Sequence, residues 1–264
     1  MRLDDPNAPE EDDAPWWRDF HDEHLAAVLL ERGDPGEVAA TLDFLIDALD
    51  LTPGAHVLDQ CCGIGSLALP LARRGFRVSA VDRAENYIER AAREAAAAGV
   101  AIDYSAADAG DYRPRDPCDG AFNWWTSFGY ADRDEDNLRM LRRAFDALRP
   151  GGVFLLDTMS IPGVLRRFQP HVITRRAVPG GELVLLRETD LDLAGGVMRK
   201  RWTYLLPDGK RLERRSRVRI YMPHELCRFF DEVGFGDVEL LGGIDRAPLG
   251  LDDLRCIVRA RRPL

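Results

Sequence analysis

The chain has 264 residues, of which 45% are hydrophobic, and its 45 acidic residues outnumber its 36 basic ones to give a net charge of −9. A chain of this length and apolar content can bury a large core, which excludes disorder throughout and predicts one large domain or a domain with an insertion. The acidic balance argues against a large phosphate-binding surface, so a small-molecule substrate is favoured and no nucleic-acid partner is expected.

No apolar run is long enough to span a membrane, and the N-terminus is acidic, unlike a secretory signal peptide. We therefore expect a cytoplasmic protein with no membrane partner. The five cysteines are an odd number and lack a zinc-ligand spacing, which predicts reduced thiols and no metal site. Composition leaves the oligomeric state open, with a homodimer as one option.

Residues 1–50 predict an acidic tail followed by a helical cap. The tail, residues 1–14, is rich in Asp and Glu. Apolar residues then recur at helical spacing over Trp16–Glu31, and Asp34-Pro35 supplies an N-cap and a first-turn proline for a second helix.

Residues 51–160 alternate between short apolar runs and helical patterns. The expected strands are 56–59, 77–82, 101–105, 120–124 and 153–159, and the expected helices are 66–74, 85–98 and 134–148. This alternation predicts a parallel sheet with helices on both faces, a Rossmann-like doubly wound α/β fold.

Residues 161–221 change to strand patterns separated by glycine-rich turns, which predicts an antiparallel β insertion. Its expected strands are 172–178, 182–193, 197–206 and 211–221. Residues 222–264 return to the α/β pattern, with a helix over 223–233 and strands over 237–241 and 254–260, and are expected to complete the core sheet.

The first strand of the α/β region ends in Asp59 and is followed by Gly63-Ile64-Gly65. Glycines without a β-carbon let a ligand approach the backbone closely. Together with Ala68 they also fit the dinucleotide fingerprint, so a nicotinamide or flavin oxidoreductase is an alternative. Asp59 argues against it, because a carboxylate repels a pyrophosphate but can hold an ammonium group.

Acidic residues also follow the next two strands. Asp82 can accept hydrogen bonds from ribose hydroxyls, a feature that dinucleotide sites share. Asp108 can accept one from an adenine amino group, and the ordered set of three acids favours S-adenosylmethionine as the ligand.

With these motifs the sequence resembles the class I S-adenosylmethionine-dependent methyltransferases over about Trp16 to Arg261. The motifs are Val57-Leu58-Asp59-Gln60-Cys61-Cys62-Gly63-Ile64-Gly65, Val81-Asp82, Ala107-Asp108 and Leu148-Arg149-Pro150-Gly151-Gly152. The chain is also similar to a bacterial subgroup with a helical N-terminal cap, a β insertion after strand five, and a sequence like Asn123-Trp124-Trp125-Thr126-Ser127-Phe128-Gly129-Tyr130. The resemblance implies a seven-stranded sheet with an antiparallel last strand.

The resemblance implies that Asp59 and Gly63 flank the methionine part of the cofactor, and that Asn123 and Trp124 form the rim near the sulfonium. The full expected cofactor set is Trp17, Asp59, Cys61, Gly63, Gly65, Asp82, Arg83, Asp108, Ala109, Asn123 and Trp124. Relatives commonly have Gly or Leu where this chain has Cys61 or Gln60, and His24 stands near the position of a cap tyrosine that contacts the cofactor carboxylate.

Methyl transfer is an in-line displacement in which alignment supplies much of the rate, so a general base is optional. The expected catalytic residues are Tyr130, His171 and His24, with Tyr130 and His171 placed beyond strands four and five, although a structural role is an alternative for each. The aromatic residues could enclose the sulfonium or simply pack; these are Trp16, Trp17, Trp124, Trp125 and Phe128.

The sequence therefore predicts methyl transfer from S-adenosylmethionine to O, N or C of a small, specialised metabolite. One alternative keeps the pocket but uses it for cyclisation or elimination. Another is an RNA-modifying enzyme that reads its substrate through Arg215, Arg217 and Arg219, although their alternation with Ser216 and Val218 is typical of a solvated strand face.

Overall fold

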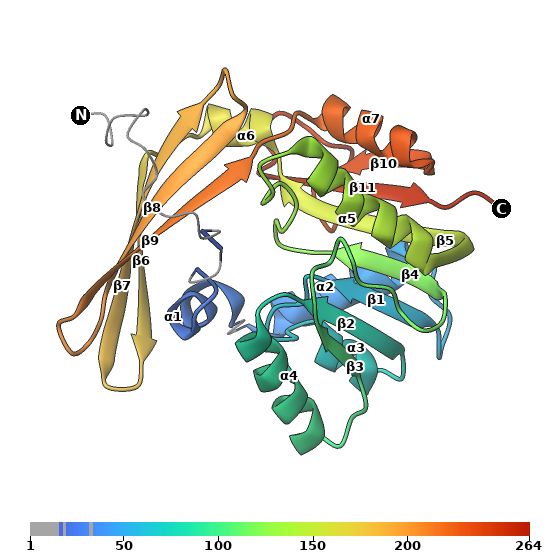
Figure 1. Cartoon of the computed structure of the whole chain (residues 1–264), viewed down its shortest axis with the longest axis horizontal. Helices are drawn as coiled ribbons and strands as arrows, with labels where there is room; N and C mark the ends of the chain where they lie inside the picture. Colours follow the sequence, from blue (N-terminus) through green and yellow to red (C-terminus); the bar gives the residue numbers. More distant parts are fainter. Residues whose placement is uncertain (1–15, 18–19, 32–33) are drawn as a thin grey trace. The chain divides into compact units, whose positions relative to one another are not determined.

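The computed structural model describes residues 16–17, 20–31 and 34–264. The chain divides into two compact units (Figure 1). One unit joins the described residues up to Glu31 to Gln169–Ile220, and the other comprises those from Asp34 to Phe168 with Tyr221–Leu264. The expected acidic tail, residues 1–14, lies outside the described residues.

The larger unit contains a seven-stranded sheet in the order β10-β11-β5-β4-β1-β2-β3. Its strands are β1 (His56–Gln60), β2 (Arg77–Asp82), β3 (Asp103–Ala106), β4 (Cys118–Asn123), β5 (Leu148–Met159), β10 (Gly236–Leu241) and β11 (Arg255–Arg261). In sheet order, β3, β2, β1, β4 and β5 are parallel neighbours, whereas β11 runs antiparallel to both β5 and β10. The predicted Rossmann-like sheet with an antiparallel last strand is therefore confirmed.

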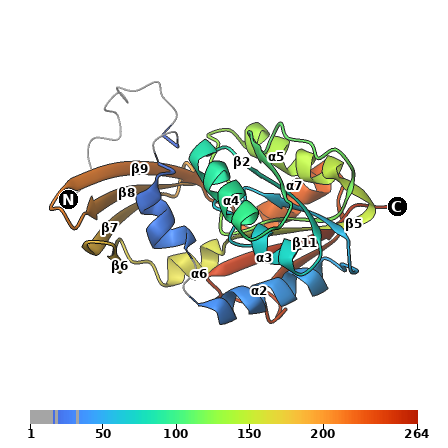
Figure 2. The ribbon, with the colours of Figure 1, turned by 90° about the horizontal axis from the view of Figure 1, so that it is seen from below.

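Helices cover both faces of this sheet. They are α2 (Pro35–Ala48), α3 (Ala68–Arg73), α4 (Glu85–Ala97), α5 (Asp134–Ala147), α6 (Ile161–Arg166) and α7 (Pro223–Val233). One buried cluster joins α5 and α7 to the sheet, and another joins α2 and α3 to its other face, so α2 and α5 lie on opposite sides (Figure 2). Because β1, β2, β3 and β4 run in parallel, their carboxyl ends meet at one edge, where ligands of open α/β sheets bind.

The smaller unit contains a four-stranded sheet in the order β6-β7-β8-β9, in which every neighbouring pair is antiparallel. The strands are β6 (His171–Val178), β7 (Gly181–Asp192), β8 (Val197–Leu205) and β9 (Arg211–Arg219). The predicted hairpins are present. A short helix α1 (Glu23–Leu25) continues into a π-helical turn η1 (Ala26–Leu30), and its buried side chains pack in one cluster with Leu185 and Tyr204 of the sheet.

The N-terminal region differs from its prediction in one respect. The described part of Trp16–Glu31 forms turns, α1 and η1 in place of one regular helix. The second helix begins as expected, with the Asp34 carboxylate accepting from the Gly36 amide at 2.8 Å and Pro35 in the first turn. Helix α6 was not predicted, because its six residues are too few to show a helical period. Among the described residues, no helix is long and apolar enough to cross a membrane.

Candidate cofactor site at the carboxyl edge of the sheet

The chain after β1 turns through three residues in the left-handed region. Cys61, Gly63 and Gly65 have φ angles of 64°, 55° and 78°. Glycine adopts this conformation at little cost, whereas a residue with a β-carbon stores local strain there. Cys61, which was noted as a departure from the family pattern, therefore stands where the backbone favours glycine.

Gly65 is also required by its surroundings. A β-carbon at this position would lie 2.6 Å from the hydroxyl oxygen of Tyr104, which is on β3. That hydroxyl is buried and has no hydrogen-bond partner among the described residues. Tyr104 was not predicted to belong to the site, and it contacts the turn after β1 from β3, two strands away in the sheet.

Asp59 is the last residue but one of the buried strand β1 and is only 3% exposed. Within the described part of the chain it forms no ion pair or side-chain hydrogen bond. Burial, and then the nearby Asp82 carboxylate, raises the pKa of Asp59 well above its ordinary range. A buried carboxyl group without a partner favours a cation, and an ammonium group of a ligand would supply one.

Asp82 and Asp108 both hold backbone amides at the edge of the sheet. Asp82 accepts from the amide of Gly63 at 2.8 Å and from that of Ala84 at 2.9 Å. Asp108 accepts from the amide of Gly110 and from the Arg83 guanidinium, each at 2.7 Å. Carboxylate oxygens have more than one acceptor site, so both residues retain capacity for a ligand.

A buried amide pair links β1 to β4 beneath the turn. The Asn123 amide donates to the Gln60 side-chain oxygen at 3.3 Å, and the Gln60 amide donates to the carbonyl oxygens of Met140 at 3.1 Å and Ala109 at 3.4 Å. Gln60, the other departure from the family pattern, therefore ties three segments together. The Asn123 side-chain oxygen is buried without a partner among the described residues.

The segment after β4 is held by residues that the sequence analysis missed. Trp125 and Thr126 have left-handed φ angles of 61° and 60°. The buried Asp157 of β5 accepts from the Trp125 amide at 2.9 Å through its carboxylate, and its carbonyl accepts from the Thr126 amide at 3.1 Å. Arg255 pairs with the same carboxylate at 2.8 Å. An acidic residue near the end of a buried strand was the available signal.

Trp124 packs into the core of the larger unit. It is 3% exposed, its ring centroid lies 5.8 Å from that of Phe44 on α2, and the Arg255 guanidinium lies 4.8 Å from its ring centroid. Trp125 is only partly buried. The geometry supports a packing role for the first tryptophan, and its contact with the cofactor stays a prediction.

Tyr130 lies within the electrostatic influence of the turn. Burial, followed by the proximity of Cys61 and Asp82, raises its pKa to about 12. The hydroxyl is therefore protonated at neutral pH and can donate a hydrogen bond there. As a catalytic residue Tyr130 stays a prediction, and its pKa favours a donor over a base.

The three other predicted residues belong to the smaller unit. His171 is exposed, with its Nε2 atom 4.0 Å from a Glu188 carboxylate oxygen. His24 is partly buried, and its ring centroid is 6.1 Å from that of Tyr204. The carbonyl of the partly buried Trp17 lies 3.1 Å from a ring nitrogen of His21. Their roles toward the cofactor and acceptor stay predictions.

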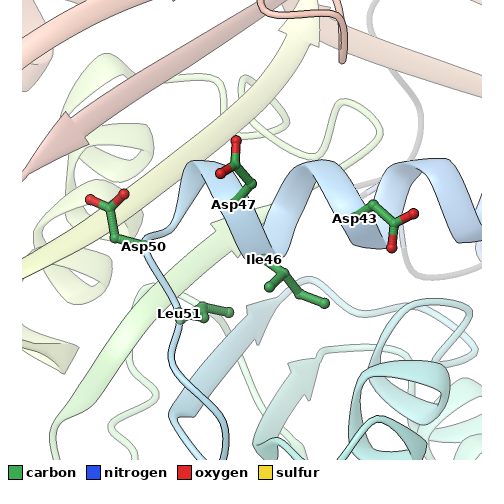
Figure 3. Close-up of a pocket in the computed structure, with 5 residues that line it drawn as sticks. All are labelled: Asp43, Ile46, Asp47, Asp50 and Leu51. Atoms are coloured by element: carbon green, nitrogen blue, oxygen red, sulfur yellow. The ribbon is translucent and has the colours of Figure 1, made fainter.

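A surface pocket at the end of α2 is lined by Asp43, Ile46, Asp47, Asp50 and Leu51 (Figure 3). Its carboxylates are paired with arginines, for example Asp43 with Arg74 and Asp50 with Arg259. Leu51 precedes β1, so this end of the pocket lies at the amino edge of the parallel strands, away from the turn after Asp59. Across the described residues, no group of three or more His, Cys, Asp and Glu side chains could hold a metal ion.

The model of a family described as methyltransferase domain matches residues 57–152, the region that contains the glycine turn and its three acids. Over these residues the chain is similar to the methyltransferase domain family. The family resemblance and the fold predicted from the sequence are thus confirmed.

Two curated relatives are similar to less than half of this chain. A ubiquinone biosynthesis O-methyltransferase of Xanthomonas campestris pv. campestris is 32% identical over 119 residues, which are 45% of this chain and 48% of the relative. An S-adenosyl-L-methionine-dependent Diels-Alderase of Talaromyces variabilis is 35% identical over 117 residues, 42% of this chain and 39% of the relative. The chain thus spans about half the length of the first relative, or less of the second.

The fold extends over nearly the whole chain in a solved structure. A sugar N-methyltransferase of a Streptoalloteichus species superposes with a TM-score of 0.73 and 21% identity, covering 89% of this chain and 92% of that protein. A likeness at this identity shows that the two proteins share a fold, which here includes the insertion after β5.

Proposed function

We propose that the protein transfers a methyl group from S-adenosylmethionine to an oxygen, nitrogen or carbon atom of a small molecule. The observation that carries this proposal is the buried Asp59 carboxyl, which has no partner among the described residues and lies beside a glycine turn. The α-ammonium group in the methionine part of the cofactor can pair with such a carboxyl, whereas the pyrophosphate of a dinucleotide would be repelled by it.

The residues present fit this cofactor. Asp59 would hold the ammonium group, Asp82 the ribose hydroxyls and Asp108 the adenine amino group, while the Gly63 and Gly65 backbone permits close approach. The bound cofactor supplies an electrophilic methyl group on a sulfonium. The chain orients the acceptor for in-line attack, and Tyr130 can donate a hydrogen bond to it.

A small-molecule acceptor is favoured over RNA by the charges on the insertion. Several arginines of the β6–β9 sheet are paired with carboxylates, such as Arg201 with Glu188 at 2.6 Å and Arg175 with Glu182 at 2.6 Å. Ser216 and Val218 are buried between Arg215, Arg217 and Arg219, as expected for one face of an ordinary strand. Paired arginines contribute little to binding a phosphate backbone. The relatives named for ubiquinone and sugar methylation support the same substrate class.

Methyl transfer is tested by product analysis. The native protein, supplied with S-adenosylmethionine and an extract of small metabolites, should produce species heavier by one methyl group, together with an equal amount of S-adenosylhomocysteine, both measured by mass spectrometry. Asp59→Asn should lose this activity, while Asp43→Asn, a change at the opposite edge of the sheet, should keep it.

A second candidate function is cyclisation or elimination in the same pocket, and the Diels-Alderase relative favours keeping it. Such chemistry would convert an acceptor without adding a methyl group. Conversion in which no S-adenosylhomocysteine accumulates would therefore support this alternative and contradict methyl transfer.

A further inference from the structure

Lysine is rare in this protein, because only Lys200 and Lys210 occur among the 36 basic residues. Lys210 is exposed, and its ammonium group pairs with Asp208 at 2.9 Å. Lys200 on β8 is partly buried and has no carboxylate partner among the described residues. The two lysines therefore differ in the feature that matters for a charged group, the presence of a counter-ion.

Lys200 shares one face of the β6–β9 sheet with three other residues of interest. Trp202 and Tyr204 follow it at alternate positions of β8, and Arg187 on β7 is the direct cross-strand partner of Trp202. The Arg187 guanidinium carbon and the Lys200 ammonium nitrogen lie 5.6 Å and 5.7 Å from the centroid of the Trp202 ring. We call Arg187, Lys200, Trp202 and Tyr204 the cationic cluster.

The cationic cluster contains polar atoms that the rest of the described chain leaves unsatisfied. The Arg187 Nε atom and the Tyr204 hydroxyl are buried and have no hydrogen-bond partner there. Burial and the adjacent Arg187 cation lower the pKa of Lys200 to about 8. Two neighbouring cations and an unpaired hydroxyl are costly in a desolvated place unless something completes them.

On the opposite face of the same strands, an arginine is fully paired with a carboxylate. The guanidinium of Arg201, next to Lys200 in sequence, binds both carboxylate oxygens of Glu188, at 2.6 Å and 2.8 Å. Glu188 is in turn next to Arg187 in sequence. On this face Arg201 therefore has a counter-ion, whereas Lys200 on the other face has none among the described residues.

Among the described residues of the smaller unit, no carboxylate pairs with Arg187 or Lys200. Asp22, at the start of α1, interacts with Arg214 of β9 at 3.4 Å and accepts from the Leu25 amide at 2.9 Å. The Arg176 side chain donates to the Val28 carbonyl at 3.3 Å. The Trp202 indole donates to Ser216 at 2.8 Å, and its ring packs against that of Phe20, with the two centroids 5.2 Å apart.

We propose that Arg187, Lys200 and Tyr204 bind an anionic group, a carboxylate or a phosphate. A guanidinium and an ammonium group donate charge-assisted hydrogen bonds to such an anion, and the phenol adds a third donor. The ligand class is then an organic acid or a phosphate ester.

The two lysines make a direct test possible. The native full-length protein, labelled with ¹³C in its lysines, should show two Cε resonances, whose pH titrations report the two amines separately. Inorganic phosphate and benzoate are added in separate series, with chloride at the same ionic strength as the control for screening. We expect one or both anions to shift the Lys200 resonance saturably and to raise its pKa from about 8 toward the ordinary 10.5.

Lys210 is the internal control, and its resonance should not respond beyond the chloride series. Arg187→Gln should weaken the anion response of Lys200 by roughly tenfold, because one charge-assisted hydrogen bond is worth about that factor. Tyr204→Phe should weaken it less. Saturation by phosphate but not benzoate assigns a phosphate ester, and the reverse assigns an organic acid.

A Lys200 resonance that neither anion moves, or that moves in parallel with Lys210, overturns the proposal without any variant having to fold. Calorimetry of S-adenosylmethionine binding tests the proposed function independently. Anion binding without cofactor binding would support this site and contradict the proposed function.

Discussion

The Asp82 carboxylate accepts a hydrogen bond from the backbone amide of Gly63 at 2.8 Å, so the acid after β2 fixes the turn after β1. Its second oxygen accepts from the amide of Ala84 at 2.9 Å. The residue expected to bind the ribose therefore also shapes the backbone that meets the methionine part. The conformation of the turn at Gly63 and the expected binding of the ribose therefore both depend on the Asp82 side chain.

Asp82→Ala should consequently reduce both stability and cofactor affinity. Two backbone amides lose a charged acceptor, which costs roughly 1.5–3 kcal/mol per bond before water replaces it. Urea unfolding and calorimetry with S-adenosylmethionine measure the two effects. The control is Asp116→Ala, which removes an exposed pair with Arg77 and should change little. Unchanged affinity in Asp82→Ala would remove this residue from the site.

Gly65→Ala should be more harmful than Gly75→Ala, although both glycines have positive φ, 78° and 88°. A β-carbon at Gly75 meets nothing within 4 Å, so only backbone strain of about 1 kcal/mol is expected there. At Gly65 the contact with the Tyr104 hydroxyl is added. The difference between the two unfolding free energies measures the contacts with Tyr104 and with the Ala91 β-carbon at 3.2 Å, and adding Tyr104→Phe to Gly65→Ala should recover the part due to the hydroxyl. Equal losses would contradict the contact.

The raised pKa of Asp59 predicts that cofactor binding is linked to proton release. Below that pKa the carboxyl is protonated and must lose its proton to pair with an ammonium group, so affinity should increase as pH rises through the raised value. Calorimetry in two buffers with different ionisation enthalpies counts the proton. Asp59→Asn should remove the pH dependence along with most of the affinity. Proton uptake on binding would contradict the assignment.

The same pKa has the opposite consequence for the unliganded protein. The folded chain retains the Asp59 proton at pH values where the unfolded chain, with an ordinary pKa of 3.8, has lost it. The contribution of this residue to stability therefore falls as pH rises from about the unfolded to the raised folded pKa. Chemical unfolding of the native protein and Asp59→Asn across this window should show the slope only in the native chain. A rising slope would refute the stated direction.

The contact between Asp157 and Arg255 should prove to hold the segment after β4. Asp157→Asn weakens the pair with Arg255 and the support of the Trp125 amide, and a loss of about 1–3 kcal/mol is expected. A double-mutant cycle with Arg255→Gln measures the coupling, which should exceed 0.5 kcal/mol because the groups are in contact. Additive losses would show that the two residues act separately.

Much of the fold could be predicted because the spacing of apolar residues and the positions of turn residues both agree with it. Helix α7 covers Pro223–Val233 and β2 covers Arg77–Asp82 as expected, since each has a clear apolar period between turn residues. The π-helical η1 and the six-residue α6 could not, because neither is long enough to establish a period. Local pattern is therefore sufficient for regular elements and insufficient for short ones.

The site shows a corresponding division. Asp59, Asp82 and Asp108 could be found from the sequence because each lies at or just after the carboxyl end of a strand of the same parallel sheet. The contact of Tyr104 on β3 with Gly65 after β1, and that of Arg255 on β11 with Asp157 on β5, join residues that are distant in the chain. Sheet order and register create these contacts, so they could not be predicted from the local pattern of the sequence.

Calorimetric titration of S-adenosylmethionine into the native protein, Asp59→Asn and Asp43→Asn tests the central claim most directly. Asp43 is an exposed carboxylate on α2, where it is paired with Arg74 and is not part of the glycine turn. We predict binding at one site per chain in the native protein and in Asp43→Asn, with a loss of at least about tenfold in Asp59→Asn, as expected for removing a buried charged partner. Absence of binding by the native chain, or undiminished binding by Asp59→Asn, would contradict the claim.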